Sequence, residues 1–139
     1  MFDFEYFLQS AINLAPALPM TLFIACFSFG VGLILGLGLA FIKLYKLPLL
    51  YPLVVVYISF FRGTPLLVQL FMFYYGIPIF LKSWGFELDF ALIDAIYYVL
   101  VIFSLNSSAY LAEIMRSALL AVDKGQKEAA FSVGMTHIQ

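Results

Sequence analysis

The fold of this chain is decided by residues 18–42, which read LPMTLFIACFSFGVGLILGLGLAFI. No charged side chain occurs between Tyr6 and Ile42. A helix rises about 1.5 Å per residue, so roughly 20 apolar residues cross the hydrocarbon core of a bilayer. Pro19 suits the first turn of a helix, where a missing N–H group is tolerated, and Lys43 follows the stretch directly. The sequence therefore predicts a membrane-spanning helix over residues 18–42.

The composition of the whole chain agrees with this assignment. Of the 139 residues, 65% are hydrophobic and 11% are charged, whereas soluble domains carry about 25% charged residues. So few charges cannot cover a soluble domain, but a surface that faces lipid needs no such cover. The formal net charge of −1 gives no reason to expect a nucleic-acid partner. We expect an all-α integral membrane protein, with residues 1–139 forming one domain in the lipid bilayer.

A second apolar region extends from residue 47 to residue 81 and contains one charge, Arg62. We expect a second span over about residues 55–81, with Pro65 at a helix start and Thr64 as its N-cap. Residues 49–61 then form either a separate shorter helix or the first part of one long kinked span, and the sequence leaves this open. Arg62 is expected at the inner interface, with its head group extended to water and lipid phosphate.

A third span is expected over about residues 91–113, with Asp94 capping its outer end. Basic residues gather after the first and third spans, and cytoplasmic loops hold the excess of Lys and Arg in membrane proteins. These residues are Lys43, Lys46, Arg116, Lys124 and Lys127. We therefore expect a multi-pass protein with its N-terminus outside and its C-terminal tail in the cytoplasm.

Polar groups lie at membrane depth in the third span, where they are costly unless they bond to another helix or line a wet cavity. Asn106, Ser107 and Ser108 are such groups. They either hold helices together or line a substrate path, and the residues alone favour neither interpretation. Glu113 and Arg116 share a helix face at a spacing of three, which predicts a local ion pair.

Small residues suggest two places of close approach. Gly32 and Gly36 form a G-x-x-x-G pair, which lets another helix pack closely, and we expect a helix of the same chain rather than a dimer partner. In the tail, Ala130 and Gly134 are four residues apart and would share one face of a short helix. A helix face of small residues fits a groove in another protein, although an ordinary amphipathic surface helix is the alternative.

Motifs of catalysis are missing from the sequence. The chain has one cysteine and one histidine, and it contains no H-E-x-x-H, no G-x-x-x-x-G-K-[ST] and no G-x-S-x-G motif. We expect no metal site, no cofactor and no enzymatic activity in this chain. If ATP drives a process here, another chain binds the ATP.

The chain resembles the permease subunits of bacterial ABC importers for polar amino acids, of the histidine, glutamine and cystine type. Three stretches carry the resemblance: residues 61–69 (FRGTPLLVQ), 106–116 (NSSAYLAEIMR), and 124–130 (KGQKEAA) followed by Gly134. The early Met20-Thr21-Leu22 also fits the start of the family's first span. Together these stretches cover nearly the whole chain.

The resemblance implies a permease with about five spans in the bacterial inner membrane. It implies pairing with a second permease subunit, as a homodimer or heterodimer, and an ATPase subunit docked under each. It also implies an extracytoplasmic solute-binding protein that delivers the amino acid. Overall likeness suggests cystine as the substrate. Such permeases continue past the motif that begins with residues 124–130. We therefore expect the chain to be an N-terminal fragment that ends inside this motif.

The resemblance also suggests roles for named residues. Residues 124–139 would form the cytoplasmic coupling region, with a set of contacts to the ATPase made by Gly125, Glu128, Ala129, Ala130 and Gly134. The translocation path would include Asn106, Ser107 and Glu113. The alternative function is a non-transporting membrane scaffold or truncated relic that pairs with a full-length permease.

Overall fold

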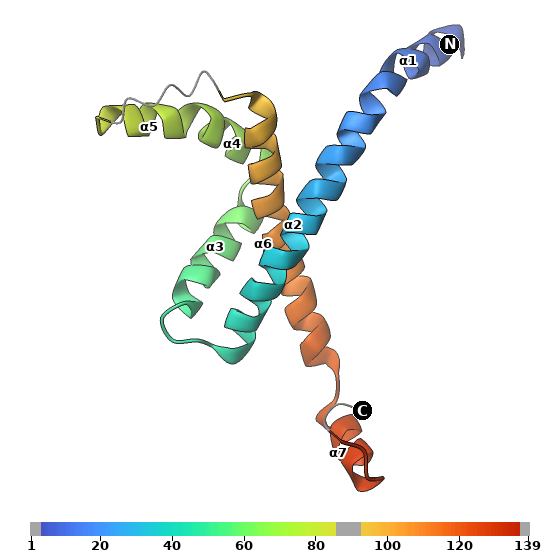
Figure 1. Cartoon of the computed structure of the whole chain (residues 1–139), viewed down its shortest axis with the longest axis vertical. Helices are drawn as coiled ribbons and strands as arrows, with labels where there is room; N and C mark the ends of the chain where they lie inside the picture. Colours follow the sequence, from blue (N-terminus) through green and yellow to red (C-terminus); the bar gives the residue numbers. More distant parts are fainter. Residues whose placement is uncertain (1–3, 86–92, 137–139) are drawn as a thin grey trace.

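The computed structural model describes residues 4–85 and 93–136, and their regular structure is entirely helical. Helix α1 (Phe4–Leu14) continues through the short 3-10 turn η1 (Ala15–Ala17) into α2 (Leu18–Tyr45), so helical backbone runs from Phe4 to Tyr45. Figure 1 shows these elements as one long arm that crosses α6 (Ala95–Ala121) near the middle of the molecule. The start of α2 at Leu18 agrees with the first predicted span.

The α2–α6 crossing is lined by small side chains. On α2, a row of buried residues repeats every fourth position: Ser28, Gly32, Gly36 and Ala40. A methyl group added at Gly32 would lie 2.8 Å from Ser107 Cβ, and one added at Gly36 would lie 3.1 Å from Leu111 Cβ. The helices pack this closely because the glycines have no side chain. The expectation that the G-x-x-x-G pair packs within the chain is confirmed.

Helix α3 (Tyr51–Gly63) is separate from the helix that follows it. Its residues Val54, Ile58 and Phe61 are buried in the main apolar cluster with Ala109 of α6. The chain then becomes extended at Thr64, with φ −117° and ψ 145°, because a residue before proline disfavours helical backbone. Of the two alternatives for residues 49–61, the structure has the separate shorter helix, and the expected span over residues 55–81 is divided between α3 and the helical segment that begins at Leu66.

The next helical segment consists of α4 (Leu66–Phe71), the π-helical turn η2 (Met72–Gly76) and α5 (Ile77–Ser83). Pro65 occupies the N-cap position of α4, and no side chain caps this helix. Thr64 was expected to do so, but its hydroxyl instead donates to the Phe60 carbonyl at 2.8 Å. In Figure 1 this segment extends sideways from α6 rather than along it.

Within the described ranges, three helical segments are long and apolar enough to cross a membrane: Phe4–Tyr45, Leu66–Ser83 and Ala95–Ala121. The prediction of an all-α protein with about three spans is confirmed. The third begins at Ala95 rather than at about residue 91. Asp94 caps it as expected, because Asp94 Oδ1 accepts a hydrogen bond from the Ile96 N–H at 3.1 Å. Residues 91 and 92, at the start of the predicted third span, lie outside the described residues.

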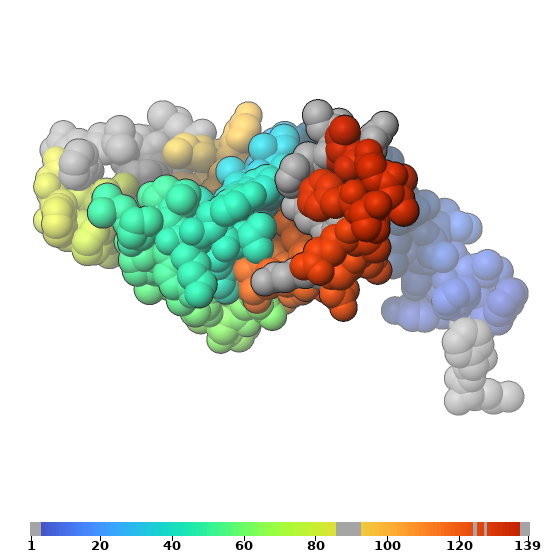
Figure 2. Space-filling view, turned by 90° about the horizontal axis from the view of Figure 1, so that it is seen from below, coloured from blue at the N-terminus to red at the C-terminus, as the bar shows by residue number. Residues whose placement is uncertain are grey.

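Helix α7 (Lys124–Ser132) follows α6 after a break at Val122, whose backbone is extended. Asp123 caps it, since its Oδ1 atom accepts from the Gly125 N–H at 2.8 Å. Viewed from below, α7 lies in front of the rest of the molecule and is uncovered on that face (Figure 2). The described part of the tail therefore presents a short, accessible helix at the end of the long α6.

Candidate functional site

A buried network of amides lies where α3 ends and α4 begins. Gln69 is 1% exposed, and its Nε2 atom donates to the Phe61 carbonyl at 2.9 Å and to the Thr64 carbonyl at 3.0 Å. Asn106 of α6 donates to Gln69 Oε1 at 3.1 Å and to the same Phe61 carbonyl at 3.2 Å. These bonds satisfy backbone groups that the break removes from helical bonding.

Asn106 therefore holds helices together in this structure, which is the first of the two interpretations that the sequence allowed. Gln69 was not among the predicted site residues, although it lies in the stretch of residues 61–69 that carries the family resemblance. Its position four residues after Pro65 is a usable signal, because a long amide there can reach the carbonyls before the proline.

The two serines that follow Asn106 face different neighbours. The Ser108 hydroxyl lies 2.8 Å from the Tyr57 hydroxyl of α3 and donates to the Leu105 carbonyl at 2.7 Å. Ser107 faces α2 at Gly32 and lines an open recess with Ser28. Ser28 Oγ is buried and has no hydrogen-bond partner among the residues described here. Ser108 thus ties α3 to α6, whereas Ser107 lies at the α2 contact.

Glu113 pairs with two cations, one on α2 and one on α6. Its Oε2 atom accepts from Arg116 Nη2 at 2.9 Å, which confirms the predicted local ion pair. Its Oε1 atom pairs with Lys43 Nζ at the end of α2, a contact that the sequence did not indicate. The side chains of Glu113 and Lys43 are 13% and 19% exposed, so the pair is partly shielded from solvent.

Arg62 lies apart from this group. Its Cζ atom is 5.4 Å from the centre of the Tyr110 ring, within the range of a cation–π contact. It belongs to the last turn of α3, whereas Lys43 belongs to the last turn of α2 before the connecting turn. The structure therefore does not place Arg62 beside Lys43 at one interface, where it was expected.

The described part of the coupling region is accessible. Gly125, Glu128 and Ala129 are exposed and Ala130 is half-buried. The prediction that Gly134 shares a helix face with Ala130 is wrong, because α7 ends at Ser132. Residues 137–139 of the expected coupling region lie outside the described residues.

Gly134 instead ends the helix. Its φ is +81°, its N–H donates to the Phe131 carbonyl at 3.1 Å, and the Met135 N–H donates to the Ala130 carbonyl at 3.1 Å. This pair of bonds is a Schellman motif, in which glycine at the left-handed position closes the last turn. Glycine at position 134 is therefore explained by the end of α7, in addition to any role in docking.

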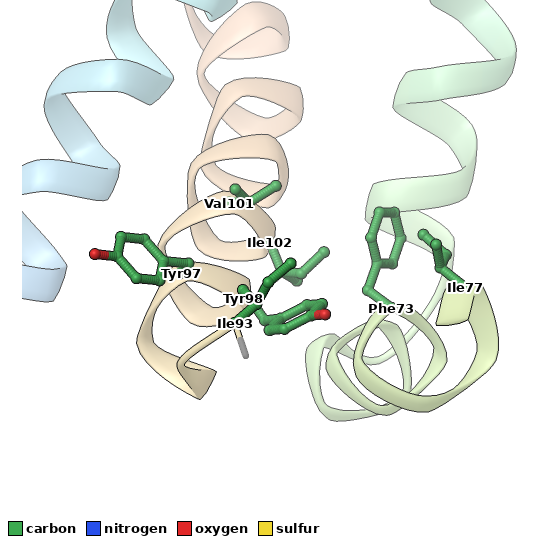
Figure 3. Close-up of a pocket in the computed structure, with 7 residues that line it drawn as sticks. All are labelled: Phe73, Ile77, Ile93, Tyr97, Tyr98, Val101 and Ile102. Carbon is green, nitrogen blue, oxygen red and sulfur yellow. The ribbon is translucent and has the colours of Figure 1, made fainter. Parts of the chain in front are cut away.

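An apolar recess of about 250 Å³ lies between the start of α6 and the η2–α5 segment. Tyr98 and Ile102 of α6 face Phe73 and Ile77 across it (Figure 3). Among the residues that the structure describes, no charged or amide side chain lines this recess.

The three residues expected in the translocation path do not converge on one cavity. Asn106 contacts the break between α3 and α4, Ser107 contacts α2, and Glu113 contacts the end of α2. What they share is α6, which receives a polar contact from each neighbouring helix. Polar contacts therefore join α6 to α2, α3 and α4.

Comparison with known proteins places this arrangement in a family. Residues 28–139 match the family of binding-protein-dependent transport system inner membrane components. The probable amino-acid permease protein YxeN of Bacillus subtilis is 44% identical, over 99% of this chain and 58% of its own length. The L-cystine transport system permease protein TcyL of the same organism is 41% identical, over 99% of this chain and 57% of its own length.

A solved structure also resembles the fold. The crystal structure of an amino acid ABC transporter with histidines superposes with a TM-score of 0.75 at 36% identity, and the match covers 99% of this chain and 60% of that chain. The chain therefore spans little more than half the length of the relatives that it matches.

Proposed function

This chain belongs to the family of binding-protein-dependent transport system inner membrane components, and on that premise we propose that it forms part of the permease of an ATP-driven amino-acid importer. The observation that carries the proposal is the family match over residues 28–139, which includes the described part of the accessible helix α7. The named relatives are amino-acid permeases, and one of them is named for L-cystine. Cystine is the substrate that we propose to test first.

We propose α7 as the coupling helix that docks an ATPase subunit. It is short, uncovered from below and attached to the end of α6 (Figure 2). Ala129 and Ala130 leave room for the walls of a groove, and Glu128 offers a carboxylate to a basic group of the partner. Gly125 lies in its first turn, and Gly134 fixes where the helix ends.

The contacts of α6 support a mechanism for passing on motion. When the ATPase subunits close on ATP, the docked α7 would carry the end of α6 with it. Glu113 would pull on α2 through Lys43, and Asn106 would pull on the break before α4. Ser107 and Asn106 would then lie along helices that shift against each other during transport. ATP hydrolysis itself would belong to the partner chain.

The remaining parts of the proposal follow from the family. We propose a second permease subunit, an extracytoplasmic solute-binding protein, and an orientation with the N-terminus outside and α7 in the cytoplasm. The positions of Lys43 and Arg116 support this orientation, because both lie toward the α7 end of the bundle. The alternative, a non-transporting scaffold that pairs with a full-length permease, predicts assembly without amino-acid uptake.

The docking proposal is tested by a bulky side chain on α7. Ala130→Trp would fill the space that the proposed groove needs, whereas Ser132→Trp adds the same ring about 200° around the helix. We expect Ala130→Trp to lose co-purification with the ATPase subunit of the same transport system and Ser132→Trp to keep it. Both variants should insert into the membrane like the unchanged protein.

Equal recovery of the ATPase with both variants would contradict docking through this face. The scaffold alternative is separated by ATP-dependent uptake of labelled L-cystine into proteoliposomes that hold the assembled complex. Assembly without uptake of L-cystine, L-glutamine or L-histidine would favour the scaffold.

A further inference from the structure

Helix α1 has one polar face and one apolar face. Glu5, Gln9 and Asn13 recur every fourth residue, so they fall within one arc of about 80°, and Tyr6 and Ser10 border this arc. The opposite face carries apolar side chains: Phe4, Phe7, Leu8, Ala11, Ile12 and Leu14. A spanning helix is apolar on all sides, whereas a helix divided in this way is typical of a membrane interface.

The α2 helix that follows is long enough to cross the bilayer without α1. It rises about 37 Å from Leu18 to Lys43. A typical tilt of about 20° shortens this only to about 35 Å across the membrane. The hydrocarbon core is about 30 Å thick. With Lys43 at one interface, Leu18 already lies among the opposite head groups, and α1 begins beyond it.

Two prolines separate α1 from α2. Pro16 and Pro19 have no N–H, so neither donates to the carbonyl four residues before it. The Ala15 carbonyl accepts from the Leu18 N–H instead, which makes the 3-10 turn η1. A 3-10 turn inside a longer helix often marks a hinge. The chain can therefore change direction at η1 while α1 and α2 keep their own hydrogen bonds.

The apolar face of α1 needs a cover. No residue of α1 is buried, and Figure 1 shows this helix at the far end of the arm, away from the α2–α6 crossing. A straight arm would hold the apolar face in water beyond the head groups. A turn at η1 would place this face at the acyl boundary and direct Glu5, Gln9 and Asn13 to water. Burial of apolar surface therefore favours the turned arrangement.

We propose that α1 turns at η1 and lies on the membrane surface at the end of α2 opposite Lys43, with its apolar face among the lipid acyl chains. The partner is a zwitterionic lipid layer, because residues 4–14 include Glu5 and no basic residue that would attract anionic head groups. Tyr6, at the border of the two faces, suits the level of the head groups. The inference holds for the permease and for the scaffold alternative, since it concerns α1 and lipid alone.

The test compares spin labels on the two faces of α1. In a Cys26→Ala background, nitroxide labels are attached to Ala11→Cys on the apolar face and to Asn13→Cys, about 200° around the helix. The assembled complex is reconstituted in phosphatidylcholine vesicles. Collisions are measured with oxygen, which concentrates in the bilayer, and with a nickel chelate, which stays in water. We expect the ratio of oxygen to nickel collisions to be several-fold higher at Ala11→Cys than at Asn13→Cys.

Three results would overturn the inference. Nickel collisions on both faces would mean that α1 stands in water. Exclusion of both reagents at Ala11→Cys would mean that protein, and not lipid, covers the apolar face. Oxygen collisions without nickel collisions on both faces would mean that α1 lies inside the hydrocarbon core. A contrast that exists only after phosphatidylglycerol is added would overturn the zwitterionic partner.

A matched pair of charged variants tests whether the apolar face holds α1 on the lipid. Ala11→Asp places a carboxylate on the apolar face, and Ser10→Asp places one at the border of the polar face. With the label on Leu8→Cys, we expect Ala11→Asp to raise nickel collisions several-fold and Ser10→Asp to leave them unchanged. Elution as a single species on gel filtration shows that each complex is assembled. Equal nickel collisions in the two variants would contradict attachment through this face.

Discussion

Gln69 is the residue on which the break between α3 and α4 depends. Its amide reaches the Phe61 and Thr64 carbonyls and also accepts from Asn106. A leucine has nearly the same shape but offers no hydrogen bond. The Thr64 carbonyl would then lose its Gln69 partner, the Phe61 carbonyl would keep only Asn106, and the Asn106 amide would lose its acceptor on Gln69; each buried group left without a partner costs about 1–3 kcal/mol. The residue therefore makes a non-helical backbone tolerable inside the bundle.

We predict that Gln69→Leu lowers the free energy of unfolding by about 2–4 kcal/mol. Denaturant unfolding in detergent measures the change. Gln126→Leu makes the same substitution on exposed α7, and it should stay within about 0.5 kcal/mol of the unchanged protein. Asn106→Leu should add less in the Gln69→Leu background than alone, because both residues serve one network. Full additivity would show that the two amides act independently.

At the scale of elements, the α2–α6 crossing is set by where the glycines of α2 face. Gly32 and Gly36 meet Ser107 and Leu111 at distances that leave no room for a methyl group. Gly30 and Gly38, on the same helix, have nothing within 4 Å of such a group. Four glycines of one helix thus fall into two classes by their neighbours alone.

This contrast predicts opposite effects of one substitution. Gly32→Ala should destabilise the protein by about 1–3 kcal/mol, because the added methyl forces α6 away. Gly30→Ala should be neutral or stabilising by up to about 1 kcal/mol, since alanine is the better helix former. Unfolding of the two variants in the same detergent gives the comparison. Similar losses in both would mean that glycine is needed for flexibility of α2 rather than for packing.

At the scale of the whole molecule, α6 connects the accessible α7 to α2, α3 and α4. Lys43 and Glu113 are 70 residues apart in sequence, and their ion pair joins the last turn of α2 to α6. Tyr57 and Asn106 make the corresponding links to α3 and α4. A displacement of α7 therefore has a physical route to each membrane segment.

The ion pair predicts coupling between distant positions. In a cycle of Lys43→Gln and Glu113→Gln, we expect a coupling energy of about 1 kcal/mol in denaturant unfolding, because the pair is only partly shielded. Lys46, three residues later, is exposed and forms no ion pair within the described ranges. Lys46→Gln combined with Glu113→Gln should therefore be additive. Equal coupling in both cycles would assign the effect to general charge and not to this contact.

Local patterns predicted much of this protein correctly. The run of apolar residues 18–42, the cap at Asp94 and the Glu113–Arg116 pair depend on neighbours within a few positions. The stretches 61–69, 106–116 and 124–130 indicated the family that residues 28–139 match. The helical face assigned to Gly134 was wrong, because a periodic pattern alone does not show where the last turn closes.

The sequence by itself determined that the chain is a membrane protein of helices and roughly where the spans lie, because burial in lipid requires long apolar runs with internal backbone bonding. Only the tertiary structure decided how Gln69 and Asn106 hold the break between α3 and α4, and which cation of α2 pairs with Glu113. These contacts join residues 37 and 70 positions apart. They depend on how the helices cross, and the crossing of two helices cannot be predicted from a local pattern of residues.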